Sequence, residues 1–409
     1  MKKSLSNTNN KGEGTLAEWL TAFLLYLSLF PYFIWRIEPL SLWFISIPLL
    51  SIFVYHVEKY NRDDAYIPFM CICVLGAFCG GSNILGVIMM ASSAIVFVVN
   101  KPFMIRVYKR YRFIFVSLIS LSLIVFLLVS FGVGLPYHYS PPPPRNTIDY
   151  GYYIFPFYAC PSVDDWRYLG LNRFNGLFDE PGVVGTISFV LLFIDKFNLK
   201  RVGNLVLFVS GVLSFSLFFY IASFLYFCYF VFFERTNIKT KLVSSLLIIL
   251  CVFQFVKTEL YGGYIGDRLL WDKASNTIVG DDRSGQDMKN YMNTIRGTTA
   301  YFWGAPDVVA RFQSDASLEK QVLQHGFITV VIFFIFFAAY SLRYLRFSKE
   351  WVLFYLFFCA ILYNRPTMFA YDRLFLYCIM IFALSSRYQR DFHSFNTSSS
   401  PKDWFFRHI

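Results

Sequence analysis

The densest chemical pattern in the chain is the run Arg173 to Thr186, RFNGLFDEPGVVGT. Glycine and proline at a helix entrance allow close backbone approach and leave amide N–H groups available, and an arginine beside them can hold two phosphate oxygens at once. The run therefore predicts a site for pyrophosphate or another anion. The same residues also suit a simpler structure, in which the glycines and Pro181 turn the chain into a membrane span and Arg173 lies at the lipid headgroups.

A second polar pattern lies near the C-terminus, where Asp372 and Arg373 fall inside an apolar stretch that follows Arg365. Charged groups at membrane depth are costly and normally face a polar interior or each other. The pair therefore lines a polar path, or it snorkels to the interface if the span is shifted by a few residues. The sequence leaves both possibilities open.

Several common catalytic motifs are missing from the sequence. It contains no G-x-S-x-G, no H-E-x-x-H, no P-loop and no D-x-D. Of the eight cysteines only Cys160 lies in a long polar segment, and none has CxxC or Cys/His spacing. We therefore expect no disulfide framework, no metal and no cofactor.

The elements that must position these residues follow from the composition. The 409 residues are 56% hydrophobic, 21% aromatic and only 15% charged, whereas a soluble domain is about one quarter charged. Apolar runs near the roughly 20 residues needed to cross a bilayer recur along most of the chain, which excludes a single-anchor enzyme and a β-barrel. The sequence predicts an all-α, polytopic integral membrane protein.

Twelve transmembrane helices are expected. Two pairs of them are hairpins, split at Gly80-Gly81-Ser82-Asn83 and near Ser214-Phe215-Ser216. The spans are 17–35, 39–57, 66–80, 83–99, 113–133, 182–197, 202–216, 218–233, 241–256, 323–342, 350–364 and 366–385.

The distribution of basic residues orients these spans. With both termini cytoplasmic, the cytoplasmic segments hold most of the Lys and Arg residues, and the short segments on the other side hold only Arg36 and Arg365. The formal charge of +11 is scattered between apolar runs, so nucleic acid is not an expected partner. The chain forms a single transmembrane domain, 1–409, with two large external loops at 134–181 and 257–322.

The motif and the loop placement together resemble the O-antigen polymerase and ligase superfamily of bacterial inner membranes. The pattern R-x-x-G-x-x-x-x-P-x-x-x-G is matched by Arg173, Gly176, Pro181 and Gly185. The second loop is similar too, although its patterns also suit a helix start, a turn and a helix boundary. These patterns are Asp281-Asp282-Arg283-Ser284-Gly285, Tyr301-Phe302-Trp303-Gly304-Ala305-Pro306, and Ser317-Leu318-Glu319 followed by Gln324-His325-Gly326-Phe327.

One departure concerns the hairpin after the first motif. Many members, ligases especially, carry an arginine directly after a serine there, whereas Ser216 is followed by Leu217. This weakens the case for a ligase and leaves open whether another arginine takes that role.

The resemblance implies a glycosyltransferase of lipopolysaccharide biosynthesis on the periplasmic face of the inner membrane. It implies that undecaprenyl-pyrophosphate-linked oligosaccharide repeat units are the substrates, and that membrane lipids, a chain-length regulator and a flippase are partners. Fixed cations would stabilise the pyrophosphate leaving group. Arg173 and Arg283 are the expected clamps, Arg296 and Arg311 the helpers, and Asp179, Glu180 and His325 the candidate general bases. Further substrate contacts are expected from Gly176, Pro181, Gly185 and Arg373.

Two other functions remain open at this stage. One is the related ligase, which transfers finished polymer to the lipid A core. The other is a transporter, the flippase of lipid-linked repeats, because twelve spans with cytoplasmic ends also suit a carrier. The two long external loops favour the polymerase, since alternating-access carriers are usually built from repeats joined by shorter loops.

Overall fold

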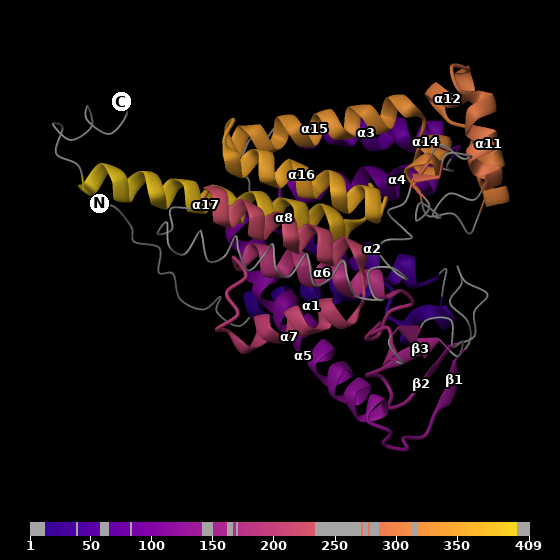
Figure 1. Cartoon of the computed structure of the whole chain (residues 1–409). Coiled ribbons are helices and arrows are strands. Elements are labelled where there is room, and N and C mark those ends of the chain that lie inside the picture. The colour runs from indigo at the N-terminus through magenta and orange to yellow at the C-terminus, as the bar shows by residue number, and fades with distance from the viewer. Residues whose placement is uncertain are drawn as a thin grey trace.

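The computed structural model describes residues 13–37, 40–57, 65–81, 84–140, 150–161, 167–168, 171–233, 271–272, 277–278, 286–312 and 317–398. This part of the chain is mostly helical, as predicted, with a few short strands (Figure 1). The apolar helices are α1 (Glu13–Leu27), α2 (Leu40–Tyr55), α3 (Tyr66–Cys79), α4 (Ile84–Ser92), α5 (Lys101–Ser130), α6 (Pro181–Ile194), α7 (Val202–Leu213), α8 (Leu217–Phe233), α15 (Phe327–Leu345), α16 (Lys349–Asn364) and α17 (Tyr371–Ser398).

Helices overlap eleven of the predicted spans, and the remaining one, 241–256, lies outside the described residues. Both predicted hairpin breaks are present. The chain leaves α3 through Gly81 at φ 62°, and it passes from α7 to α8 through Phe215 at φ 47°. A positive φ cannot continue a right-handed helix. The described residues also include the 3₁₀ helices Tyr32–Ile37, Ser93–Phe97 and Ala310–Phe312.

The first half of α5 departs from the sequence prediction, which treats 100–112 as a connecting segment. Asn100 caps the helix by accepting the N–H of Phe103, and no glycine or proline interrupts the chain beyond Pro102. The basic side chains find partners on neighbouring elements: Arg106 Nε lies 2.5 Å from Glu18 Oε1, and Arg112 Nη2 lies 2.9 Å from Asp195 Oδ2. The basic segment therefore forms the first turns of α5.

Within the described residues, α5 and α15 are the two helices long and apolar enough to cross a membrane, by length and composition. The other apolar helices are shorter, yet they also present large apolar side chains to the surface. Phe44, Phe78, Phe113 and Ile335 are all more than 60% exposed. Apolar exposure on this scale is costly in water and suits contact with lipid.

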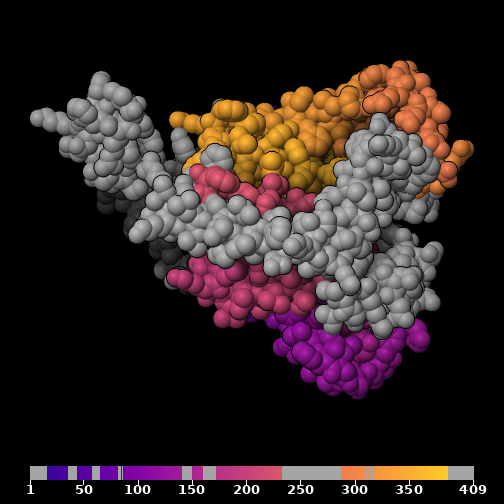
Figure 2. Space-filling view, viewed as in Figure 1, coloured from indigo at the N-terminus to yellow at the C-terminus, as the bar shows by residue number. Residues whose placement is uncertain are grey.

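The core is built from aromatic rings shared between distant segments. Phe69 of α3 contacts Phe337 of α15, whose ring centroid lies 4.7 Å from that of Phe358 of α16. Phe358 in turn contacts Tyr377 of α17 at 4.9 Å. In Figure 2, α15 to α17 lie beside α6 to α8 on one face of the molecule. The ring-to-ring contacts therefore tie the C-terminal helices to the N-terminal half.

The described parts of the two long segments lie at the same end of the helix bundle, opposite the C-terminal end of α17 (Figure 1). The first contributes the antiparallel sheet β1 (His138–Ser140), β2 (Tyr150–Tyr152) and β3 (Ala159–Pro161) and the pair β4 (Arg167–Tyr168) and β5 (Leu171–Asn172). The second contributes β6 (Trp271–Asp272), β7 (Thr277–Ile278), α11 (Gln286–Ile295), α12 (Thr299–Trp303), α13 (Pro306–Val309) and α14 (Leu318–His325).

Candidate functional site

The candidate site is the stretch that leads into α6, residues 173–186, which we name the α6 entrance. Pro181 is the first residue of the helix, and Glu180 before it is extended, at φ −132° and ψ 134°. Proline suits this position because its φ is already helical and its missing N–H has no helical partner. The sequence thus fixes the start of α6 locally.

Hydrogen bonds donated by Tyr32, Tyr150 and Ala159 to backbone carbonyls hold the α6 entrance in place. The Ala159 N–H donates to the Gly176 carbonyl at 2.9 Å, and the Tyr32 N–H donates to the Leu177 carbonyl at 2.8 Å. The Tyr150 hydroxyl donates to the Asp179 carbonyl. These bonds preorganise the backbone without any ligand.

The side chain of Arg173 contacts the turn between α7 and α8. Its Nε donates to the Ser214 carbonyl at 3.3 Å and its Nη2 to the Phe215 carbonyl at 3.2 Å. A guanidinium has five N–H donors, and these two bonds orient it.

Two glycines of the α6 entrance are required by packing. Gly176 has φ 62°, and a Cβ there would lie 2.8 Å from Ile119 Cδ1. A Cβ on Gly185 would lie 2.4 Å from Ser216 Cβ, so α6 touches the α7–α8 turn directly. Both glycines therefore face protein, as expected for a turn into a helix.

The end of α16 contacts the α6 entrance. Arg365 forms an ion pair with Glu180, and the side chains are 17% and 44% exposed. The adjacent Asn364 donates from Nδ2 to Thr186 Oγ1 at 2.9 Å. The helix pair α16–α17 therefore docks on the first turns of α6 through polar contacts.

Arg365 and Asn175 are two residues that the sequence-based site list misses. Arg365 could have been found, because it is one of the two basic residues expected on the external side outside the long loops. Asn175 is fully buried, and neither its Nδ2 nor its Oδ1 has a hydrogen-bond partner among the described residues. The residues around Asn175 in the sequence do not indicate that its side chain is buried without hydrogen-bond partners.

His325 ends α14, just before α15, and is 5% exposed. Its Nδ1 lies 2.9 Å from the Gly76 carbonyl of α3. A carbonyl only accepts, so Nδ1 carries the proton and Nε2 holds the lone pair when the ring is neutral. Burial lowers the pKa of His325, partly offset by the bond to Gly76, which favours the neutral ring. Its ring also meets Phe369 of the α16–α17 connection at 5.4 Å.

The remaining predicted residues lie in other surroundings. Arg373 pairs with Asp372 at 3.3 Å, and the side chains are 7% and 4% exposed, so this pair faces inward and does not snorkel. Arg296 directly follows α11, Arg311 lies in the 3₁₀ helix after α13, and both are exposed. Arg283 lies outside the described residues.

The α6 entrance thus brings together Arg173, Asp179, Glu180 and the previously unlisted Arg365. In the described ranges, no three His, Cys, Asp or Glu residues lie close enough to hold a metal ion. Guanidinium groups such as those of Arg173 and Arg365 are able to bind an anion such as phosphate. Searches of protein-family models, curated proteins and solved structures find no match to this chain.

Proposed function

We propose that the chain is an O-antigen polymerase, a glycosyltransferase of the bacterial inner membrane. The observation that carries the proposal is the α6 entrance, where Arg173 contacts the turn between α7 and α8 and Arg365 pairs with Glu180 at the start of α6. The motif of Arg173, Gly176, Pro181 and Gly185 supports it from the sequence. So does the position of both long segments at one end of the bundle.

The proposal includes the finer topology. Twelve helices cross the membrane, both termini are cytoplasmic, and the end of the bundle that carries α11, α12, α14 and β1–β3 faces the periplasm. The exposed apolar side chains of the shorter helices support spans beyond α5 and α15. The substrates are then oligosaccharides linked to undecaprenyl pyrophosphate, and the polymer grows in the periplasm.

The reaction is a substitution at the anomeric carbon of the donor chain. A hydroxyl of the acceptor repeat unit attacks that carbon, the bond to the pyrophosphate oxygen breaks, and the hydroxyl proton passes to a base. The leaving undecaprenyl pyrophosphate is negatively charged, so fixed guanidinium groups stabilise it, and no covalent enzyme intermediate is required.

Within the proposal the residues divide as follows. Arg173 and Arg365 hold the pyrophosphate, since the planar guanidinium suits phosphate oxygens. Glu180 orients Arg365 before substrate arrives. Asp179, at the same helix start, takes the proton, while His325 is held by Gly76 on another helix.

The test is a gel of surface lipopolysaccharide and of lipid-linked intermediates from a strain in which this gene is deleted. Lipopolysaccharide in which the lipid A core carries one repeat unit, without a ladder of longer chains, supports the polymerase. Accumulated lipid-linked polymer without surface O-antigen would instead mean a ligase. Repeat units retained on the cytoplasmic face would mean a flippase, and an unchanged ladder would overturn the proposal.

A further inference from the structure

A groove runs between α3 and α15 on the surface of the bundle. Its volume is about 760 Å³. Ile72, Phe336 and Tyr340 form its buried floor, and Cys71, Ile335 and Ala339 are exposed at its walls. The groove lies outside the α6 entrance and takes no part in the proposed reaction.

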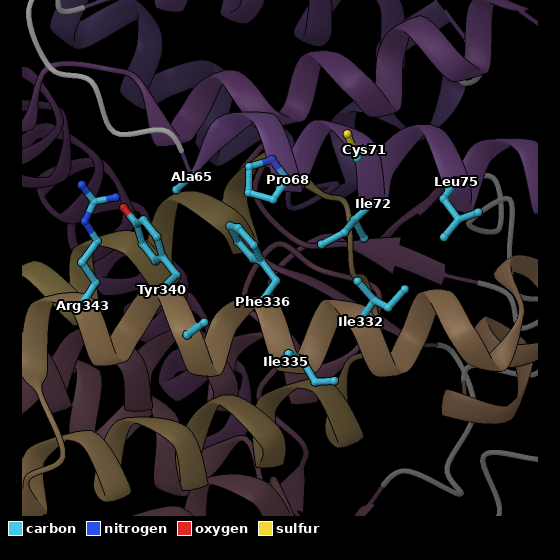
Figure 3. A pocket seen from close by; sticks show the side chains of 11 residues that line it. Ala65, Pro68, Cys71, Ile72, Leu75, Ile332, Ile335, Phe336, Tyr340 and Arg343 are labelled. Atoms are coloured by element: carbon cyan, nitrogen blue, oxygen red, sulfur yellow. The ribbon is translucent and has the colours of Figure 1, made fainter.

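The lining of the groove changes sharply along its length. It is apolar from Leu75 and Ile332 as far as Phe336, and it ends at the Tyr340 hydroxyl and the Arg343 guanidinium (Figure 3). Arg343 lies in the last turn of α15, at the end of the helix remote from α14. One end of the groove therefore suits an anion, and the rest suits hydrocarbon.

The length of the groove matches one leaflet of a bilayer. Ile332 and Arg343 are eleven residues apart on α15, which corresponds to about 16 Å of helix at 1.5 Å per residue. Half of the hydrocarbon core of a membrane is about 15 Å. A single acyl chain can therefore lie along the groove while its headgroup stays at Arg343.

We propose that this groove is a binding site for an anionic phospholipid, with one acyl chain between α3 and α15 and the phosphate at Arg343. The cationic end lies opposite α11, α12 and α14, so the bound lipid belongs to the leaflet remote from the α6 entrance (Figure 1). Charge complementarity at Arg343 and the apolar walls distinguish this occupant from a second copy of the chain or a neutral lipid. The inference rests on the proposed membrane topology and does not depend on the proposed polymerase activity.

The test uses the purified full chain, native mass spectrometry and titration with phosphatidylglycerol or phosphatidylcholine of the same acyl chains. The wild type should retain phosphatidylglycerol at a concentration at least fivefold lower than phosphatidylcholine. Arg343→Ala should abolish this preference. Arg346→Ala, which removes an exposed arginine from the same end of α15 but not from the groove, should keep it.

A second pair of variants tests the groove itself. Ala339→Trp fills it and should reduce the retention of both lipids, whereas Leu356→Trp, at an exposed position of α16 outside the groove, should not. Equal retention of the two lipids by the wild type would overturn the proposal. So would a preference that survives Arg343→Ala, or a lipid-free dimer that Ala339→Trp dissociates.

Discussion

Arg365 and Arg373 lie near the two ends of the short connection between α16 and α17, and each forms an ion pair. The Arg365–Glu180 pair and the Arg373–Asp372 pair differ in their access to solvent. Arg365 is 17% and Glu180 44% exposed, whereas Arg373 and Asp372 are 7% and 4% exposed. A partly exposed pair can exchange a partner for an incoming anion, while a sealed pair cannot do so without unfolding. Under the proposed function, the comparison favours Arg365 as a binding residue and Arg373 as structural support of the bundle.

The largest expected effect comes from breaking the sealed pair. Arg373→Ala leaves Asp372 buried without its cation and should lower the free energy of unfolding by about 3–5 kcal/mol. Thermal unfolding of the purified protein in detergent measures this. The double variant Asp372→Asn with Arg373→Met removes both charges and should be more stable than Arg373→Ala. If Arg373→Ala unfolded at the same temperature as the wild type, the Arg373–Asp372 pair would not be the structural support that distinguishes it from Arg365–Glu180.

The next effect comes from the exposed pair and acts on activity. Arg365→Ala should reduce polymer formation about a hundredfold, a cost of about 2.7 kcal/mol in the transition state, because it removes a positive charge that stabilises the leaving pyrophosphate. Arg365→Lys should retain part of the activity. The readout is the O-antigen ladder at matched protein levels, with Arg346→Ala as an exposed control. A full ladder from Arg365→Ala would show that this arginine does not act on substrate.

A packing change sharpens the role of the turn that Arg173 contacts. Gly185→Ala places a methyl group against Ser216 Cβ and should destabilise the protein by about 2 kcal/mol, since the contact is between well-packed elements. Gly134→Ala is the matched control, because nothing lies within 4 Å of a Cβ there. Equal unfolding midpoints for the two variants would mean that α6 and the turn separate easily.

The smallest effect concerns His325 and pH. Because burial lowers its pKa, the unfolded chain binds the proton more readily than the folded chain. The stabilisation is complete above the ordinary histidine pKa of about 6.5 and is lost as the pH falls through the lowered value. The unfolding midpoint should therefore fall less between pH 7.5 and 5.5 in His325→Gln than in the wild type. An identical fall of the unfolding midpoint in the variant and the wild type would show that His325 does not cause the pH dependence.

The features that could be predicted from sequence are local. Pro181 starts α6 because proline is favoured at the first position of a helix. The break at Gly81 follows from a pair of glycines between two apolar runs, and the break at Phe215 from the serines on either side of it. Charge distribution places the two long segments on one side. These signals depend on neighbours in the chain, so a single sequence contains them.

The contacts that complete the α6 entrance could not be predicted this way. The pairing of Arg365 with Glu180, and of Arg173 with the Ser214 carbonyl, joins segments far apart in the chain, so it depends on how the helices pack. The basic segment before Phe113 becomes helical for a similar reason, since Glu18 and Asp195 neutralise its arginines. The strands β1–β3 are also set by contact with the α6 entrance through Ala159 and Tyr150.

The most direct measurement of the central claim is polymer formation by the purified, reconstituted chain. The substrate is the lipid-linked single repeat unit isolated from the deletion strain. The account predicts products of increasing length, one undecaprenyl pyrophosphate released for each bond formed, and loss of both in Arg173→Ala and Arg365→Ala at unchanged unfolding midpoints. Native protein that stays folded, receives these repeat units and joins none of them would contradict the account.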